Sequence, residues 1–300
     1  MLKLTLFLGL LISAIALDEL DGSVRIPSNY SKFHVPVVDR SKPLKVTVAI
    51  IIIQILHIDF EKSALAFDVE FILTWQDELI SITEGLDEEV IVGDSSILWL
   101  PDLYVFRLKH FSVKKTNRLS SSLTLRNNGS VVDVEYLLEA KVETMCDAQF
   151  ADFPFNKHEC FLQIGSFSKN ASKIIFTPDY QYDLSTLVEL KSFDYDITAS
   201  YLTGPDTVVK GVKDPQNVYS VVGIKLDLYN KWTKYITLYY VPTGLIVITS
   251  WIFFLLPSTS YPARTALLVT VFLLLISIFS SVVNETPNTS DGGWLFISLF

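Results

Sequence analysis

The sequence lacks the motifs that mark an enzyme or a nucleic-acid-binding protein. Its 300 residues include only two cysteines and four histidines, and the histidines share no metal-ligand spacing. No Gly-x-Ser-x-Gly elbow, phosphate loop or dinucleotide fingerprint occurs, so we expect neither catalysis nor a cofactor. The formal net charge is −9 and no basic stripe is present, which argues against binding to nucleic acid.

Charged residues become scarce after Lys234. From there to the C-terminus only three remain, namely Arg264, Glu285 and Asp291. A membrane helix needs roughly 20 apolar residues, and two runs qualify, at about 238–256 and 264–284. A third apolar run begins at 294 and stops at Phe300, too early to cross a bilayer, so the chain looks truncated within a third helix.

The two cysteines lie in the part of the chain that we expect outside the cell. Residues 1–16 have the basic start, apolar run and small residues of a secretory signal peptide, so the chain beyond them enters an oxidising compartment. A single pair, Cys146 and Cys160, predicts a disulfide there, worth about 3 kcal/mol in the chain-entropy model. Three glycosylation sequons before the first apolar run agree with this location: Asn29, Asn128 and Asn170.

The segment between signal peptide and membrane alternates apolar and polar residues with a period of two. The stretch 67–75 is an example, and a turn signal such as Asn127-Asn-Gly129 separates such stretches. Many short strands predict one antiparallel β-sandwich over 17–236. The expected fold class is therefore mainly β outside the membrane, followed by α-helical transmembrane segments in 237–300.

The second apolar run carries a polar stripe when it is projected at 100° per residue. The stripe consists of Ala266, Thr270, Leu273, Ser277, Ser281 and Asn284. Several copies around an axis would line a pore with small polar groups, and Leu273 would form its apolar constriction. Alternatively, the hydroxyls only join helices to one another.

Several motifs together resemble landmarks of the Cys-loop, or pentameric, ligand-gated ion channels, in the order of that family. They are Trp75-Gln-Asp, Trp99-Leu-Pro-Asp102, the loop closed by Cys146 and Cys160, Tyr240-Val-Pro242, and Pro262-Ala-Arg264. The last resembles the anion-selective members, and the whole is most similar to their invertebrate-type branch. The resemblance implies a homo- or hetero-pentamer with four further subunits, ligand sites between neighbouring sandwiches and a gate of second helices.

The resemblance also assigns the ligand site. Four aromatic residues match the side of the site that one subunit provides: Tyr104, Phe106, Phe167 and Tyr219. They would form a cage that attracts a cationic amine. On the facing subunit the family places an aromatic residue where Glu70 stands and an arginine where Ile72 stands. Glu70 suits an ammonium group and repels a carboxylate.

Several positions in and near the disulfide loop depart from the family pattern and concern the coupling of ligand binding to the pore, among them Ala148 and Gln149. The family usually has an aspartate where Asn156 stands and an arginine where Asn230 stands, so this coupling differs here. His158, inside the loop, is interpreted as a surface or interface residue.

These observations predict a subunit of a neurotransmitter-gated, chloride-selective channel that a small extracellular amine opens. Its partners are the transmitter, chloride and membrane lipid, and its location is the plasma membrane, including synapses, with several crossings and the N-terminal domain outside. Selectivity is assigned to Pro262, Ala263 and Arg264, because no acidic residue stands there and each helix aims its positive end at the inner mouth. The alternatives are a truncated, non-conducting subunit that binds ligand or modulates assembly and, more remotely, an adhesion protein.

Overall fold

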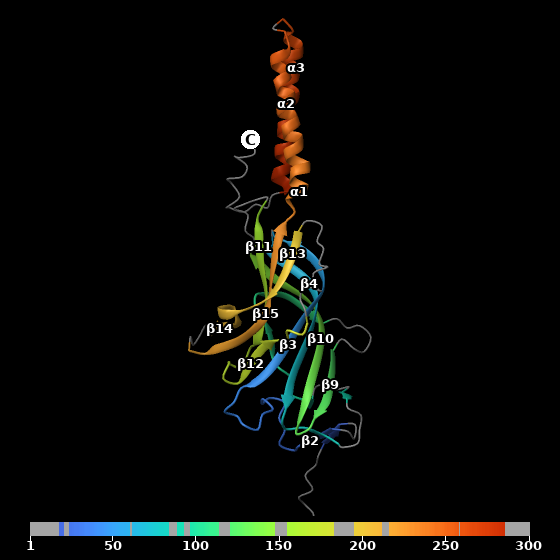
Figure 1. Ribbon diagram of the computed structural model, residues 1–300, viewed down its shortest axis with the longest axis vertical. Coiled ribbons are helices and arrows are strands. Elements are labelled where there is room, and N and C mark those ends of the chain that lie inside the picture. Colours follow the sequence, from blue (N-terminus) through green and yellow to red (C-terminus); the bar gives the residue numbers. More distant parts are fainter. Residues whose placement is uncertain are drawn as a thin grey trace, which may run out of the picture.

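The structure is a computed structural model that describes residues 18–20, 24–60, 62–83, 89–92, 97–113, 121–147, 155–182, 195–211, 216–257 and 259–285. It is elongated, with a β-domain at one end and a pair of helices at the other (Figure 1). The expected signal peptide, 1–16, and the start of a third helix at 294 lie outside the described residues.

The strands occupy the described part of the chain up to Asn230. They are β1 (Asp18–Leu20), β2 (Val24–Ile26), β3 (Leu44–Asp59), β4 (Ala64–Asp77), β5 (Ser81–Ile82), β6 (Glu89–Val92), β7 (Leu103–Val105), β8 (Leu108–Val113), β9 (Ser121–Asn128), β10 (Val131–Asp147), β11 (Lys157–Ser166), β12 (Ile174–Pro178), β13 (Tyr195–Tyr201), β14 (Val208–Lys210) and β15 (Val218–Asn230). The helical elements are the 3₁₀-helix η3 (Gly204–Thr207), α1 (Trp232–Tyr235), the π-helical turn η4 (Ile236–Tyr240), α2 (Val241–Leu255) and α3 (Tyr261–Glu285).

Two layers of strands form a sandwich. One layer runs β12-β3-β4-β10, with β8 and β9 along the far edge of β10 and β6 beyond β9. The other contains β7, β11, β15 and β13, with β14 on β15. The layers join where the end of β10 pairs with β11 at Cys146 and Cys160. The expected sandwich is confirmed, with one difference: β12 runs parallel to β3.

The core follows from the alternation in the sequence. In β4 the side chains of Phe67, Val69, Phe71, Leu73 and Trp75 are at most 2% exposed, because strand geometry sends every second residue to the same face. Large apolar side chains of β10, next to β4 in the same layer, and of β11 and β15 in the other layer complete this core. Gly129, with φ +72°, forms the predicted turn between β9 and β10.

The first helical segment runs without interruption from Trp232 to Leu255 and begins earlier than the expected 238. The expected start came from apolar composition, which marks only the part of a helix that lies in the membrane. The helix itself continues through the more polar residues before it. The π-helical turn η4 directly precedes Pro242. Proline has no N–H for the carbonyl four residues earlier, and a wider turn is one way in which a helix accommodates that loss.

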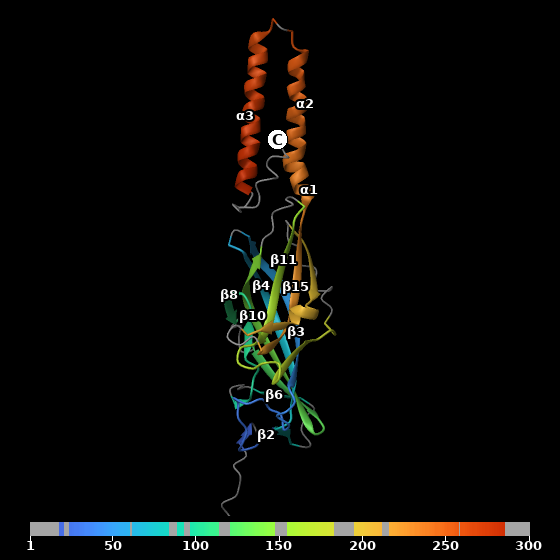
Figure 2. The same cartoon turned by 90° about the vertical axis from the view of Figure 1, so that its left-hand side faces the viewer.

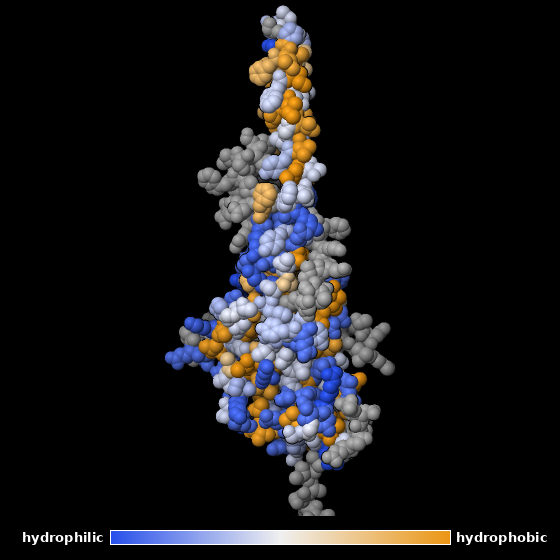
Figure 3. Space-filling view, viewed as in Figure 1, coloured by the Kyte–Doolittle hydropathy of each residue, from blue (hydrophilic) through white to orange (hydrophobic). Residues whose placement is uncertain are grey.

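The helices α2 and α3 lie antiparallel, side by side (Figure 2). Their outer surfaces are strongly apolar (Figure 3); Phe254 and Leu255, for example, are 79% and 83% exposed. Two described helical stretches, Trp232–Leu255 and Tyr261–Ser281, are long and apolar enough to cross a membrane. An apolar surface of this kind has no favourable place in water and fits a lipid environment.

Candidate functional site

Three of the four predicted ligand-site aromatics lie together. The ring centroids of Tyr104 and Phe106 are 5.0 Å apart, edge to face, and that of Phe167 is 5.7 Å from Tyr104. Register explains the meeting, because Tyr104 in β7 pairs directly with Gly165 in β11. A side chain at 165 would meet the Phe106 ring at 3.1 Å and the Ser220 carbonyl at 3.0 Å, so glycine permits this approach.

A carboxylate holds the loop that carries Phe167. Asp102 accepts hydrogen bonds from the Ser166 hydroxyl (2.5 Å) and from the backbone N–H of Ser168 (2.7 Å). Phe167 lies between these two anchors and is nevertheless 73% exposed. The aromatic cluster, defined as Tyr104, Phe106 and Phe167, therefore has a fixed backbone and an open face.

The two tryptophan motifs meet inside the β-domain. The Trp75 and Trp99 rings pack edge to face at 5.6 Å. Tyr30 links the motifs, because its hydroxyl donates to Asp77 (2.9 Å) and accepts from the Trp99 N–H (3.0 Å). Burial raises the pKa of the Asp77 carboxyl, and burial together with the nearby Asp77 charge raises the pKa of the Tyr30 hydroxyl. The motif that carries Asp102 is thus fixed to the core.

The other predicted ligand residues lie elsewhere. Tyr219 is half-buried in β15 opposite Val209 of β14, and its ring takes no part in the ring contacts found among the described residues. Glu70 and Ile72 are half-buried on β4, in the other layer. One subunit therefore presents the two groups of residues on different layers, as a site shared between neighbouring subunits requires.

Glu70 faces a second carboxylate that sequence reasoning did not single out. Glu139 in β10 lies directly opposite Glu70 in the register of the two strands. Within the described part of the chain, Glu70 has no ion-pair partner. Like charges directly opposite on neighbouring strands repel each other, so Glu139 adds to the negative potential around Glu70. Only the strand register reveals Glu139, since the two residues are far apart in the sequence.

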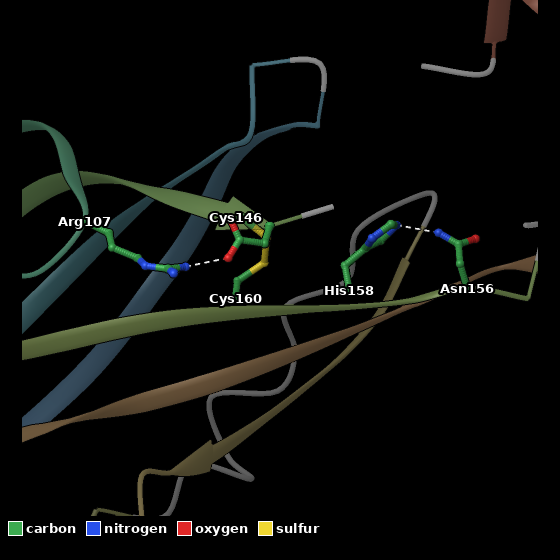
Figure 4. The surroundings of a disulfide bond; sticks show 6 residues. Arg107, Cys146, Asn156, His158 and Cys160 are labelled. Atoms are coloured by element: carbon green, nitrogen blue, oxygen red, sulfur yellow. Dashed lines mark hydrogen bonds and ion pairs between the residues drawn. A yellow bond between two sulfur atoms is a disulfide. The ribbon is translucent and has the colours of Figure 1, made fainter. Parts of the chain in front are cut away.

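Cys146 and Cys160 form the predicted disulfide, with a Cα–Cα distance of 4.7 Å. Both residues are buried, at the point where the two layers join. Arg107 lies beside the bond (Figure 4), and its guanidinium group pairs with Asp147 at 2.6 Å. The pair is half-exposed, so it adds little stability compared with the covalent link.

Asn156, His158 and Asn230 form a buried polar network, named here the asparagine network. The side-chain amide of Asn230 donates to the side-chain carbonyl of Asn156 at 3.1 Å, and the backbone N–H of Asn230 donates to the Asn156 carbonyl at 3.3 Å. Asn156 Nδ2 lies 2.5 Å from His158 Nε2 (Figure 4). The positions where the family usually has opposite charges thus carry two neutral side chains bonded to each other.

His158 belongs to the core of the chain, so its interpretation as a surface or interface residue was wrong. Its exposure is 0%, because even-numbered residues of β11 face inward, and its ring packs on Phe60 with centroids 4.0 Å apart. Burial lowers the pKa of the imidazole to about 4. Tyr195 lies against the same side of the sandwich, with its ring 6.0 Å from that of His158. At neutral pH the whole asparagine network is therefore uncharged.

An exposed aromatic contact continues from this network toward the helices. The rings of Phe155 and Trp232 are tilted with centroids 6.4 Å apart, and their exposures are 65% and 47%. Trp232 begins α1 two residues after Asn230. The disulfide loop thus touches the chain through Asn230 and Trp232, directly before it enters the apolar helices.

The predicted pore stripe of α3 faces away from α2. Its described members, Ala266, Thr270, Leu273, Ser277 and Ser281, are all exposed, whereas the side chain of Asn284 lies outside the described set. The half-buried residues of α3 form another face, roughly 120° around the helix at 100° per residue. They are Arg264, Leu267, Val271, Leu275 and Ile278. The stripe is therefore not used to join α3 to α2 within one chain.

Arg264 points to the end of the preceding helix. Its Nη2 donates to the carbonyl of Leu256 at 2.5 Å, and its guanidinium carbon lies 5.0 Å from the centroid of the Phe253 ring. A cation at a helix C-terminus satisfies free carbonyls and complements the helix dipole. Pro262 and Ala263, the other predicted selectivity residues, are exposed at the start of α3.

The three predicted glycosylation sites differ in accessibility. Asn29 is exposed, and Asn128 is exposed in the β9–β10 turn, where its amide bonds Asp133 at 2.8 Å. Asn170 is half-buried, and its Nδ2 donates to Asn217 at 3.1 Å. A glycan on Asn170 would interrupt that bond, so Asn29 and Asn128 are the more accessible acceptors.

Comparison with known proteins finds related sequences. Residues 23–228 match the family model of the neurotransmitter-gated ion-channel ligand-binding domain. The chain is 24% identical over 251 residues to the human gamma-aminobutyric acid receptor subunit epsilon, covering 83% of this chain and 48% of that protein. It is 23% identical over 251 residues to the gamma-4 subunit from Gallus gallus, covering 83% and 53%.

A third relative is the alpha-2 subunit from Rattus norvegicus, 24% identical over 225 residues, with 74% of this chain and 49% of that protein covered. The chain thus spans about half the length of these curated relatives. All three come from vertebrates, so nearness to invertebrate-type members stays a prediction.

Proposed function

The chain belongs to the neurotransmitter-gated ion-channel family, which consists of channels and not of enzymes, and we propose that it is one subunit of a pentameric chloride channel opened by a small extracellular amine. The observation that carries the proposal is the aromatic cluster of Tyr104, Phe106 and Phe167, held open by Asp102. The three relatives are gamma-aminobutyric acid receptor subunits, which supports a small transmitter as the ligand. Gamma-aminobutyric acid carries a carboxylate, however, so the choice of an amine rests on the residues of this chain.

The charge around the proposed site favours an ammonium group. Aromatic faces attract cations, and the attraction grows when the cation is desolvated. On the proposed facing side, Glu70 and Glu139 oppose each other, and Ile72 stands where an arginine would hold a ligand carboxylate. The ammonium group of an amine without a carboxylate would pair with Glu70, whereas an anionic amino acid would leave its carboxylate next to Glu70.

The proposed pore uses the polar stripe of α3, with Leu273 as its constriction. The N-terminus of α3 carries a positive partial charge, and no carboxylate stands at Ser260, Tyr261, Pro262 or Ala263. Arg264 adds a full positive charge nearby, anchored on Leu256. This arrangement supports anion passage through the plasma membrane, with the β-domain outside.

The test is a voltage-clamp recording from cells that express the full reading frame encoding this chain, with a panel of amines and amino acids. We expect an amine to open a current whose reversal potential follows external chloride and ignores external sodium. Ala263→Glu with Pro262 deleted should move selectivity toward cations, while deletion of Pro262 alone serves as its control. A current that follows sodium would refute the anion assignment, and activation by anionic amino acids alone would refute the amine.

A further inference from the structure

A basic cavity lies on the β-domain, and none of its lining residues belongs to the aromatic cluster. It has a volume of about 240 Å³ and is named here the basic cavity. Five basic side chains line it: His34, Arg40, Lys42, Lys169 and Lys173. Its remaining lining residues are two valines, so no carboxylate contributes to the wall. In a chain with a formal net charge of −9, this is a local concentration of positive charge.

Most of these cations lack a neutralising partner. Within the part of the chain that the structure describes, no carboxylate lies within ion-pair distance of Arg40, Lys169 or Lys173. Lys42 approaches Asp39 only at 3.9 Å, and both side chains are mostly exposed. Such a pair is screened by water and salt and leaves much of the lysine charge available. Cations gathered around one hollow repel each other, so a bound anion would be stabilising.

The walls of the basic cavity are held in place by hydrogen bonds between distant segments. The Lys173 ammonium group donates to the carbonyl of Arg40 at 3.1 Å. The backbone N–H of Leu44, at the start of β3, donates to the Lys173 carbonyl at 2.9 Å. On the other side, the Lys169 N–H donates to the Ser166 hydroxyl at 2.9 Å. The charges therefore converge on a preformed hollow and do not merely lie on a flexible loop.

We propose that the basic cavity binds a small anion that carries a phosphate or sulfate group. Arginine offers a planar fork of donors to a tetrahedral oxyanion, and lysines add compact point charges. A phosphate can arrive as a free ion and a sulfate as part of an extracellular sugar, and both present the same oxygens. The basic cavity shares no lining residue with the aromatic cluster or the pore, although Lys169 lies two residues after Phe167. Binding to it can therefore be measured whether or not the proposed channel function holds.

The experiment measures binding of inorganic phosphate and, separately, of a sulfated disaccharide to the detergent-solubilised chain by calorimetry at low ionic strength. The variant Arg40→Gln/Lys173→Gln removes two cavity charges, and glutamine at 173 can still donate to the carbonyl of residue 40. The control Arg25→Gln/Lys210→Gln removes two exposed charges outside the cavity. If the double variant fails to fold, as judged by thermal unfolding, Lys169→Gln replaces it.

We expect the cavity variant to weaken binding by about tenfold or more, and the control to bind like the parent, because hydrogen bonds to charged groups carry energies of this size. Raising the salt concentration should weaken binding further. Binding of phosphate alone would identify a free ion as the ligand, and binding of the disaccharide alone would identify a sulfated sugar. Failure of both probes to bind the parent, or equal binding by parent and cavity variant, would overturn the proposal.

Discussion

At the scale of single residues, the charge of Glu70 decides which transmitter the proposed site accepts. We expect Glu70→Gln to raise the agonist concentration for half-maximal current by roughly tenfold, because a charge-assisted contact to the ammonium group is lost. Expression should be unchanged, since Glu70 has no ion pair to lose among the described residues. Agonist dose–response curves and surface labelling measure both effects.

A matched control for this prediction is Glu143→Gln, which removes a half-buried carboxylate from the same face of the sheet. It should leave the dose–response curve unchanged. If Glu143→Gln and Glu70→Gln behaved alike, the effect would be one of general surface charge and the assignment of Glu70 would fail.

The aromatic side of the site gives a second test. Phe167→Ala should weaken agonist binding by about 2 kcal/mol, the energy of a desolvated cation over a ring.

The burial of His158 leads us to expect that the stability of the folded chain depends on pH. Its pKa is about 4 in the folded chain and about 6.5 when exposed, so the unfolded state binds a proton first as the pH falls. Neutral His158 therefore makes its full contribution to the free energy of unfolding above pH 6.5, and this contribution is lost as the pH falls toward 4. The loss amounts to roughly 3 kcal/mol, by linkage.

Thermal unfolding of the solubilised chain between pH 7 and pH 4 tests this prediction. The melting temperature of the parent should fall more steeply than that of His158→Gln, which keeps an acceptor for Asn156 but cannot titrate in this range. His110→Gln, at an exposed histidine, is the control and should follow the parent. Parallel pH profiles of the parent and His158→Gln would contradict the assignment.

At the scale of elements, the asparagine network ties the disulfide loop to β15 and hence to the first helix. We expect Asn156→Asp alone and Asn230→Arg alone each to reduce surface expression and agonist response, because each buries an unpaired charge. The double variant should recover much of both, since it forms an ion pair in place of the neutral bond. The coupling energy in a double-mutant cycle should lie between about 0.5 and 3 kcal/mol.

The control for the cycle pairs Asn156→Asp with Lys210→Arg, a change at an exposed position outside the network. Strict additivity of Asn156→Asp and Asn230→Arg would show that the two elements do not communicate through this contact, although the hydrogen bond joins them in the structure.

The orientation of α3 leads to a prediction about gating. Leu273 is 59% exposed and lies on the stripe that faces away from α2. If this stripe lines the pore, Leu273→Ser should admit water to the constriction and produce resting current or a lower agonist requirement. Leu268→Ser changes an equally exposed leucine on another face of the same helix and should have little effect on the resting current.

Recordings of resting current and agonist sensitivity separate the two leucine variants. Equal behaviour of Leu273→Ser and Leu268→Ser would mean that Leu273 does not face the pore. The stripe would then contact other helices, which was the alternative interpretation of its hydroxyls.

At the scale of the whole molecule, the disulfide connects the two layers at the end nearest the helices. Closing such a loop stabilises a fold by about 3 kcal/mol, a large fraction of the roughly 5–15 kcal/mol of a typical domain. We therefore expect Cys146→Ser or Cys160→Ser to abolish delivery to the cell surface. Surface biotinylation checks this, with Ser200→Ala, at an exposed serine outside the three sequons, as a control.

The double variant Cys146→Ser/Cys160→Ser separates loss of the bond from the effect of a free thiol. It should remain absent from the surface, like the single variants. Normal surface labelling of all three variants would show that the disulfide is not necessary for the sandwich.

The sequence alone determined the features that depend on local periodicity and on counting. Alternation along β4 predicts which side chains enter the core, because strand geometry is the same in every sheet. Two apolar runs predict two helices, since length and composition suffice for a membrane crossing. The disulfide was predictable because the chain offers only one pair of cysteines.

Only the tertiary structure decided which distant side chains meet. Strand register sets Glu139 opposite Glu70, and the approach of β15 to the disulfide loop bonds Asn230 to Asn156, 74 positions away in the chain. The packing of the two layers buries His158, and the helix hairpin directs Arg264 onto Leu256. These contacts arise from register and long-range packing, which are set by the summed burial of many residues and are not encoded in any one local pattern.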